Sequence, residues 1–415
     1  MEEWKEYKLG EICEVINGRA YKQEELLDGG KYRVLRVGNI FQGNNWYYSD
    51  MELPEDKYCN KGDLLYAWSC GFAPYIWEGE KTIYHYHIWK LVENQNIVNR
   101  IFLYYYLIEN TKRFLGGTHG SVMLHLTKRE MEEQTVKLPS LSIQQHIASI
   151  LKSLDDKIEV NRKINENLEQ QAQALFKSWL VDFEPFKDAE FVESELGMIP
   201  KGWRVGKYDD IIESTISGDW GKENPEGNYT HKVACIRGCD FQDIKNGLRG
   251  KTPERYILEK NFQTKHFKDK DILVEISGGT ATVSTGRVCP VSQLLIDKFN
   301  ADIVCTNFCR LVRPKSKYGA YLYYSWLYKY NNKVMFGYEN GTSGIKNFRI
   351  KDFTALEPVV IPSEEALLSF QSMIDKLQMK LQMNGFESQK LATLRDTLLP
   401  KLMSGELKVN EVNCY

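Results

Sequence analysis

The sequence lacks long apolar stretches. No run approaches the roughly 18 apolar residues that a membrane-spanning helix needs, and the first residues, from Met1 to Lys5, are polar and acidic, unlike the start of a secretory signal. We therefore expect a cytoplasmic protein with no membrane partner. The chain also lacks an excess of either charge, since 54 Lys and Arg residues oppose 56 Asp and Glu residues. This balance excludes a polycation but leaves room for a local basic groove.

Cysteine is scarce and odd in number, with nine residues in 415. A disulfide framework is therefore not expected. Two Cys-x3-Cys pairs, Cys235 with Cys239 and Cys305 with Cys309, raise the alternative of a zinc site. Both pairs lie in strand-like runs, where two thiols four residues apart would share one face of a strand. We interpret them as buried thiols and predict no metal site.

The chain repeats itself after about 200 residues. Trp4 and Ile12 recur as Trp203 and Ile211 at a constant offset of 199. The segments LRVGNI, GDLLYAWS and GGTHGS recur as IRGCDF, KDILVEIS and NGTSGI, at offsets that drift from 201 to 224. A period of this length is too long for a solenoid. We predict two copies of one globular domain whose loops differ in length.

Each copy leads into a long helix. After Pro139 and Pro362 the two copies match at an offset of 223 for some forty residues without a gap. The apolar residues alternate at spacings of four and three, which is the seam of a coiled coil. Ser142 followed by Gln145 fits a capping box at the start of the first helix, and Pro185 is predicted to end it. The matched seam positions are Ile147, Leu151, Leu154, Ile158, Leu168, Leu175 and Trp179 in the first helix, and Phe370, Ile374, Leu377, Leu381, Leu391, Leu398 and Leu402 in the second.

Both seams carry polar residues near their centres. Asn161 and Asn165 in the first helix correspond to Asn384 and Ser388 in the second. Two copies related by a pseudo-two-fold axis would pair their helices antiparallel, so that Asn165 faces Asn384 and Asn161 faces Ser388. Buried Asn in a seam fixes the register of a coiled coil. The alternative is that the helices splay there and leave these side chains in solvent.

The central region resembles a known family. The run LPSLSIQQHIASILKSLDDKI (138–158), its continuation NRKINENLEQQAQALFKSWLVDFEPF and the following SELGMIPKGW (194–203) are similar to the middle of specificity subunits of Type I restriction–modification systems. The likeness extends over the whole chain in its order of domain, helix, domain, helix. The second helix departs from the pattern, because it lacks the Gln-Gln pair of Gln144 and Gln145, so its contacts with partner subunits are less directly implied.

This resemblance implies an α+β fold: two duplicated target-recognition domains separated by a pair of long antiparallel coiled-coil helices, with pseudo-two-fold symmetry. It implies a non-catalytic subunit that reads a bipartite, asymmetric site in double-stranded DNA while helix length sets the spacing. The expected partners are two methyltransferase subunits, which carry S-adenosylmethionine, and restriction–translocase subunits; no cofactor is expected on this chain. The domains are 1–139 and 203–361 (recognition), 140–184 and 362–405 (helices), 185–202 (linker) and 406–415 (tail).

Glycine-bearing polar loops next to basic residues are the candidates for DNA contact. Glycine lets backbone N–H groups approach phosphates, while hydroxyl, imidazole and guanidinium groups donate to phosphates or base edges. Such loops occupy matched places in the two copies, at 67–75 with 277–287 and at 116–129 with 340–351. Ordinary surface turns are the alternative for any one residue. The predicted DNA-binding residues are Trp68, Tyr75, Thr118, His119, Ser121, His125, Lys128, Arg129, Thr280, Thr282, Arg287, Thr342, Ser343, Lys346 and Arg349.

Other motifs argue against catalysis by this chain. There is no Asn/Asp-Pro-Pro-Tyr/Phe stretch, and GLRGKT (247–252) has too few residues between its glycines for a phosphate-binding P-loop. His85 and His87, in YHYHIW, are interpreted as strand packing or a DNA-facing edge rather than as metal ligands. The aromatic runs at 101–107 and 321–330 could stack on bases, but their helical spacing favours a core helix in each copy.

Two other functions remain open at this level. A self-contained DNA-modifying enzyme would methylate DNA without partners. A purely structural coiled-coil adaptor would not bind duplex DNA even within a complete complex.

Overall fold

The computed structural model describes residues 4–41, 43, 45–69, 71–115, 126–280, 282–341 and 345–409. It divides into two compact units. Unit 1 consists of Met1–Lys157 together with Leu391–Tyr415, and unit 2 of Ile158–Lys390. Each unit therefore contains one globular block and a segment of each long helix.

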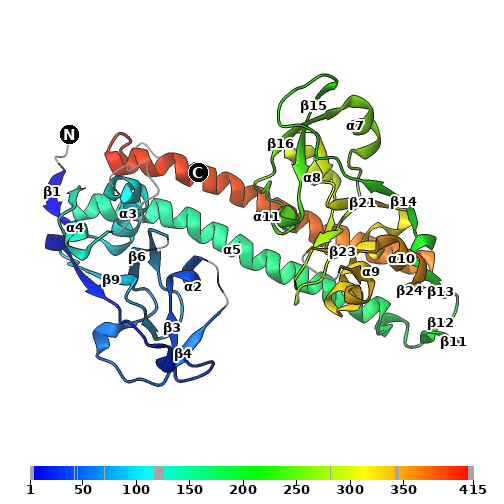
Figure 1. Cartoon of the computed structure of the whole chain (residues 1–415), viewed down its shortest axis with the longest axis horizontal. Coiled ribbons are helices and arrows are strands. Elements are labelled where there is room, and N and C mark those ends of the chain that lie inside the picture. The colour runs from blue at the N-terminus through cyan, green and yellow to red at the C-terminus, as the bar shows by residue number, and fades with distance from the viewer. Residues whose placement is uncertain are drawn as a thin grey trace. The chain divides into compact units, whose positions relative to one another are not determined.

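Unit 1 is built on two four-stranded sheets (Figure 1). Its elements are β1 (Lys5–Lys8), α1 (Leu9–Ile12), β2 (Cys13–Asn17), β3 (Tyr32–Leu35), α2 (Val37–Phe41), β4 (Tyr47–Ser49), β5 (Tyr58–Cys59), β6 (Leu64–Ala67), β7 (Ala73–Ile76), β8 (Thr82–Tyr84), β9 (Ile88–Glu93), α3 (Arg100–Phe114), α4 (Lys128–Glu132) and β10 (Thr135–Leu138). One sheet has the antiparallel order β2-β9-β6-β7, and the other has the order β4-β3-β8-β5 with β3 and β8 parallel. Strands β1 and β10 pair separately and close the block.

Unit 2 repeats this plan. Its elements are β11 (Phe191–Ser194), β12 (Gly197–Pro200), β13 (Arg204–Lys207), β14 (Ile212–Ser217), β15 (Tyr229–Ile236), α6 (Phe241–Lys245), β16 (Glu254–Leu258), α7 (Glu259–Lys265), β17 (Ile272–Glu275), β18 (Ser277–Gly278), β19 (Val288–Pro290), α8 (Gln293–Phe299), β20 (Ile303–Cys305), β21 (Cys309–Pro314), α9 (Gly319–Asn331), β22 (Glu339–Asn340), β23 (Lys346–Phe348), α10 (Ile350–Leu356) and β24 (Pro358–Ile361). The order β14-β21-β17-β19 matches β2-β9-β6-β7, and the parallel pair β15–β20 matches β3–β8. The pair β13–β24 closes this block as β1–β10 closes the first.

Burial explains why these sequences form these strands. The edge strands β2 and β14 alternate buried and exposed side chains, as expected for a strand with one solvated face. The inner strands β6 (LLYA) and β17 (ILVE) are buried at all four positions, because they are covered on both faces. The two inner strands begin at Leu64 and Ile272. These positions are 208 residues apart, as are the matched segments GDLLYAWS and KDILVEIS that contain them.

The aromatic runs form core helices, as predicted. In unit 1, Phe102 and Tyr106 of α3 are buried in one cluster with Trp89 of β9. In unit 2, Tyr324 and Trp326 of α9 are buried in the corresponding cluster. These rings are therefore part of the hydrophobic core and cannot act as base-stacking platforms.

The two long helices are α5 (Leu141–Leu180) and α11 (Glu364–Ser404). At about 1.5 Å per residue, the 40 residues of α5 span about 60 Å. The predicted capping box is misplaced, since α5 begins before Ser142, and the carbonyl of Ser140 accepts the amide hydrogen bond of Gln144. The helix also ends five residues before Pro185, which instead lies in a short 3₁₀ turn.

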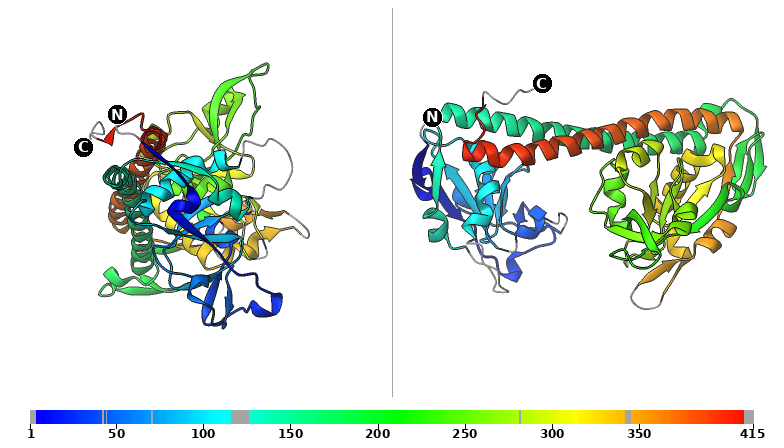
Figure 2. Two further views of the ribbon diagram at one scale, coloured as in Figure 1. Left: turned by 90° about the vertical axis from the view of Figure 1, so that its left-hand side faces the viewer. Right: turned by 90° about the horizontal axis from the view of Figure 1, so that it is seen from above.

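Within unit 2 the helices lie side by side and antiparallel (Figure 2). Asn384 Nδ2 donates to Asn165 Oδ1 at 2.9 Å, and Asn161 Nδ2 donates to Ser388 Oγ at 3.2 Å. The three Asn side chains are at most 5% exposed, so the alternative of splayed, solvated helices does not hold. Another register of the helices would leave these amides unpaired in the seam, and burying an unpaired polar group costs free energy.

The helix segments of unit 1 follow the same register. Arg395 Nη1 forms an ion pair with Asp155 Oδ1 at 2.5 Å. The residue numbers 155 and 395 sum to 550, and those of the pairs in unit 2 sum to 549. The helix segments of unit 1 are therefore paired antiparallel, as those of unit 2 are.

Glycine lets the block of unit 2 approach α11 closely. A Cβ built on Gly385 would lie 1.8 Å from the carbonyl oxygen of Asn246, and one on Gly247 would lie 2.6 Å from the carbonyl oxygen of Gln382. Gly247 has a φ of +75°, so it has a second reason to be glycine. Glycine weakens a helix interior, and its presence at position 385 of α11 is thus explained by backbone-to-backbone contact.

We expect Gly385→Ala to destabilise unit 2 by about 3 kcal/mol, because the contacting atoms belong to backbone that cannot move aside without distorting the packed block. Thermal unfolding followed by circular dichroism measures this as a lower midpoint. Gly337→Ala is the matched control, since nothing lies within 4 Å of its built Cβ. Equal midpoints for the two variants would contradict the close approach.

The cysteine pairs are divided between elements rather than sharing a strand face. Cys235 lies in β15 and Cys305 in β20, while Cys309 begins β21. These three thiols are buried, and desolvation raises the pKa of Cys235 and of Cys309 to about 12. Cys239 is exposed, so its interpretation as a buried thiol is wrong: it lies in the 3₁₀ turn that follows β15 and faces solvent.

Candidate nucleic-acid interface

Two of the predicted loops of unit 2 meet in one small sheet. Strand β23 pairs with β18, which begins the loop at 277–287, and with β22, which begins the loop at 340–351. The side chain of Glu339 connects them, because it accepts hydrogen bonds from the backbone N and Oγ1 of Thr285 at 2.6 and 2.9 Å and pairs with Lys346 at 2.9 Å. Lys346 is thus held beside the first loop by an acidic partner.

The first loop carries two exposed hydroxyls. Thr280 Oγ1 accepts the backbone N–H groups of Thr282 and Val283 at 3.2 and 3.0 Å, which closes a tight turn. Both threonines are exposed, and Val283 beside them is 46% exposed. The sequence-predicted Thr280, Thr282 and Lys346 are therefore brought together on one surface of unit 2.

Two other predicted cations of unit 2 are engaged within the fold. Arg287 makes a two-pronged contact with Glu275, with Nε and Nη2 each 2.8 Å from a carboxylate oxygen, and it also donates to the carbonyl of Gly238. Glu275 is 9% exposed, so this ion pair neutralises a buried carboxylate. Arg349 precedes α10, where it pairs with Asp352 at 2.6 Å and donates to the carbonyl of Gly337. Both arginines therefore make contacts that stabilise the fold of unit 2.

In unit 1 the aromatic candidates are half-buried. Trp68, after β6, stacks on Trp89 with ring centroids 5.6 Å apart and donates Nε1–H to the carbonyl of Tyr86 at 2.8 Å. Tyr75 lies in β7 and packs against the cluster that contains Trp77. Trp68 therefore supports the neighbouring turn more than it projects from the surface.

Two further candidates of unit 1 lie in α4. Lys128 and Arg129 begin this short helix, where they pair with Glu132 and Glu133 one turn later, and the Arg129 side chain is 85% exposed. Exposed pairs of this kind contribute little stability, so both cations can exchange partners. Six candidates lie outside the described residues: Thr118, His119, Ser121, His125, Thr342 and Ser343.

Arg36 is a further candidate that is not among the residues predicted from the sequence. It precedes α2, its guanidinium lies 4.2 Å from the ring centre of Tyr47, and Nη2 donates to the carbonyl of Asn45. Among the described residues, no carboxylate forms an ion pair with it. Burial, followed by the neighbouring charges of His87 and Arg36, lowers the pKa of His85 to about 4, so this imidazole is neutral at pH 7. The sequence feature that could have indicated Arg36 is the arginine shared by the matched segments LRVGNI and IRGCDF.

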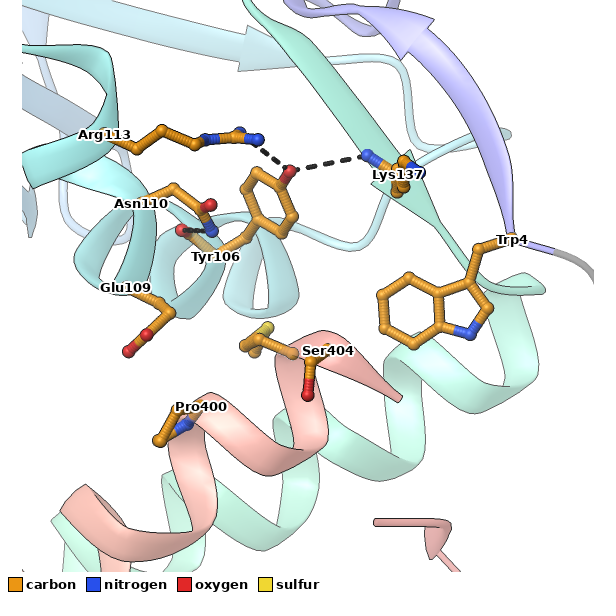
Figure 3. A pocket seen from close by; sticks show the side chains of 9 residues that line it. Trp4, Tyr106, Glu109, Asn110, Arg113, Lys137, Pro400 and Ser404 are labelled. Atoms are coloured by element: carbon orange, nitrogen blue, oxygen red, sulfur yellow. Dashed lines mark hydrogen bonds between the residues drawn. The ribbon is translucent and has the colours of Figure 1, made fainter. Parts of the chain in front are cut away.

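A cavity of about 310 Å³ in unit 1 is lined by side chains of β10, α3 and α11 (Figure 3). The hydroxyl of Tyr106 accepts from Arg113 Nη2 at 3.2 Å and from the backbone N of Lys137 at 3.4 Å. No nucleophile with an adjacent base occurs in this lining. Across the described ranges, no group of three or more His, Cys, Asp or Glu side chains could hold a metal ion.

Comparison with known proteins shows which family the chain resembles. Residues 1–170 match the family described as Type I restriction modification DNA specificity domain. The chain is 29% identical over 330 residues to the Type I restriction enzyme MjaIX specificity subunit of Methanocaldococcus jannaschii, covering 78% of this chain and 72% of that protein. It is 25% identical over 468 aligned positions to the HindI specificity subunit of Haemophilus influenzae, covering 98% and 100%. The first part of the chain thus resembles a Type I restriction DNA specificity domain, and the relatives it matches over most of its length are specificity subunits.

A solved structure shares the fold of this chain. The S subunit of a Type I restriction–modification system from M. genitalium superposes with a TM-score of 0.53 at 15% identity, covering 97% of this chain and 96% of the other. The family match ends within α5, and the second copy in the chain supplies equivalent elements from β13 to β24. In the part of the chain that the structure describes, no helix is long and apolar enough to cross a membrane.

Proposed function

We propose that this chain is a specificity subunit that reads a split, asymmetric duplex DNA sequence, one part with each unit, and that it has no catalytic site of its own. The observation that carries the proposal is the repetition of one scaffold with different surfaces. The two blocks share strand order and closing strand pairs, whereas their exposed turns differ in sequence. A single-sequence reader would need only one such block, and a structural adaptor would need none.

The long helices are proposed to set the gap between the two half-sites. Their register is fixed by buried Asn165 and Asn384 and by the ion pair of Asp155 with Arg395. A helix pair held in one register is stiff compared with a loop, so it can define a distance along DNA. A span of about 60 Å corresponds to about 18 base pairs at 3.4 Å each.

Methyl transfer is proposed to take place on partner methyltransferase subunits that bind S-adenosylmethionine, in a complex that restriction–translocase subunits join. Incubation of the purified chain with duplex DNA and a labelled methyl donor is expected to give no incorporation. Addition of the methyltransferase subunit is expected to give incorporation into adenine. Incorporation by the chain alone would instead support a self-contained modifying enzyme.

Exposed apolar residues on both long helices support docking of the methyltransferase. Val160 and Ile164 on α5 are 49% and 37% exposed, and Met379 and Met383 on α11 are 57% and 55% exposed. Each pair is separated by four residues and so lies on one face of its helix. Exposed apolar stripes of this kind are typical of surfaces that a partner covers.

The double substitution Met379→Asp and Met383→Asp is expected to lower co-purification with the methyltransferase at least about tenfold, because docking would bury two unpaired carboxylates. Met198→Asp is the control, since Met198 is also 55% exposed but lies in β12. Unfolding midpoints should be unchanged for both variants. Undiminished co-purification of the double variant would exclude this face of α11 as a dock.

A further inference from the structure

One turn in each block is built by the same backbone hydrogen bonds. In unit 1 it is His85–His87, between β8 and β9, and in unit 2 it is 306–308, between β20 and β21. The amide of Trp68 donates to the carbonyl of His87 at 3.1 Å, and the amide of Ile276 donates to that of Phe308 at 2.8 Å. These bonds attach each turn to the residue that follows the inner strand, β6 or β17.

The other ends of the two turns are matched as well. The amide of His85 donates to the carbonyl of Leu35 at 2.9 Å, and that of Thr306 donates to the carbonyl of Ile236 at 3.0 Å. Leu35 and Ile236 end the parallel strands β3 and β15. Each turn is therefore held at both ends by the sheets of its own unit, as a rigid element.

A glycine lies behind each turn. A Cβ built on Gly18 would lie 2.3 Å from the carbonyl oxygen of His85, and one on Gly218 would lie 2.0 Å from that of Thr306. Neither glycine has a positive φ, so close approach alone requires the missing side chain. Both copies keep this contact, so the backbone of the two turns is anchored by the same set of contacts.

The side chains on this common backbone are different. Unit 1 presents His85, Tyr86 and His87, whose rings contact one another with centroids 4.0 to 4.8 Å apart. Unit 2 presents Asn307, which is exposed, and Phe308, which is 63% exposed. Exposed aromatic rings on a turn whose backbone is held at both ends are well placed to contact a ligand.

The charge beside the two turns also differs. Arg36 next to the first turn has no ion-pair partner among the described residues, and its buried Nε has no hydrogen-bond partner there. Its counterpart Arg237 is bound at two points by Asp240, with distances of 3.0 and 2.9 Å. Asn39 replaces that aspartate in unit 1 and accepts only the backbone N–H of Arg36. The charge of the guanidinium beside the first turn is therefore not neutralised by a described carboxylate, whereas that beside the second turn is.

We propose that these two turns are the matched specificity-determining elements of the protein: Tyr86, with Arg36, contacts base edges of one half-site, and Asn307 with Phe308 contacts those of the other. The inference rests on the proposed function and adds the residues that read the bases. Arginine pairs with guanine O6 and N7, asparagine pairs with adenine N6 and N7, and an apolar ring contacts the thymine methyl group. The first turn thus suits a guanine-containing half-site, and the second suits adenine next to thymine.

The test uses the full chain in complex with its methyltransferase subunits, with methylated positions mapped in host DNA. Asn307→Ala is expected to relax one position of one half-site about tenfold or more, and Tyr86→Ala to relax the other half-site only. Tyr86→Phe removes just the hydroxyl, so it keeps the test informative if the alanine variant assembles poorly. Asn228→Ala, at an exposed asparagine of unit 2 away from the turn, is the control and should leave the motif unchanged.

The outcomes separate this inference from the proposed function. If the unsubstituted complex methylates a split motif and both turn variants retain every position of it, the turns do not read bases and the inference is overturned while the proposed function stands. Relaxation of both halves by one variant would also overturn it. An unsubstituted complex that methylates no split motif would overturn the proposed function and, with it, this assignment.

Discussion

Replacing residues 1–139 with the corresponding block of a related specificity subunit is expected to change one half of the methylated DNA sequence completely and to leave the other half unchanged. The physical reason is that the block is closed on itself. Its first strand pairs with its last, with Lys5 opposite Leu138, so the cut falls between β10 and the start of α5. The hydrophobic core of unit 2 shares no residue with the exchanged segment.

The exchange must preserve the contacts of the block with α5. Gln144 is buried and binds three backbone groups: it accepts from the amide of Asn99 and donates to the carbonyls of Ile97 and Pro139. Tyr105 donates its hydroxyl to Asp155 at 2.5 Å. A donor block with an aromatic hydroxyl at the position of Tyr105 is therefore the suitable choice. The reciprocal exchange of residues 203–361 is the control, and it should change only the half that the first exchange preserved.

Removing one heptad from each long helix, at positions that face each other, is expected to shorten the gap between the half-sites while preserving their bases. The register places Asp156–Arg162 of α5 opposite Glu387–Thr393 of α11, because facing residue numbers sum to about 549. This double deletion retains the Asn165–Asn384 and Asp155–Arg395 pairs. Seven residues at 1.5 Å each shorten the pair by about 10 Å, or about three base pairs.

Deletion of either heptad alone is the matched control. It shifts one helix past the other by seven residues, so Asn165 and Asn384 can no longer pair and each becomes an unsatisfied polar group in the seam. We expect the single deletions to lower the unfolding midpoint and the double deletion to restore it. A folded double deletion that still prefers the original gap would show that the helices do not set the spacing.

The scaffold could be predicted because its signals are local and repeated. The two helix seams match at a constant offset of 223, which indicates that each helix pairs with the other copy. A pseudo-two-fold relation between the copies then requires antiparallel pairing. The aromatic runs of α3 and α9 showed helical spacing, which was sufficient to assign them to the core. Helix ends were less predictable: the capping box was assigned to Ser142, although the polar residue before α5 is Ser140.

The candidate site was less predictable, because it depends on contacts between distant residues. Arg287 looked like a phosphate ligand from its glycine-rich loop, but the sequence does not reveal that Glu275, on a strand twelve residues earlier, is buried and binds it at two points. Conversely, nothing in the segment TNFCR (306–310) indicates a role for Phe308. Its exposure and the backbone hydrogen bond that matches the one in unit 1 are seen only in the structure. Side-chain partners across a sheet follow from the fold and cannot be read from spacing.

The most direct test of the central claim is a map of the methylated bases in the DNA of a host that carries this chain with its methyltransferase partner. We expect one asymmetric motif made of two short specific parts separated by a nonspecific gap of constant length, and we expect it to disappear when the gene for this chain is deleted. A single uninterrupted motif, or methylation that persists without this chain, would contradict it.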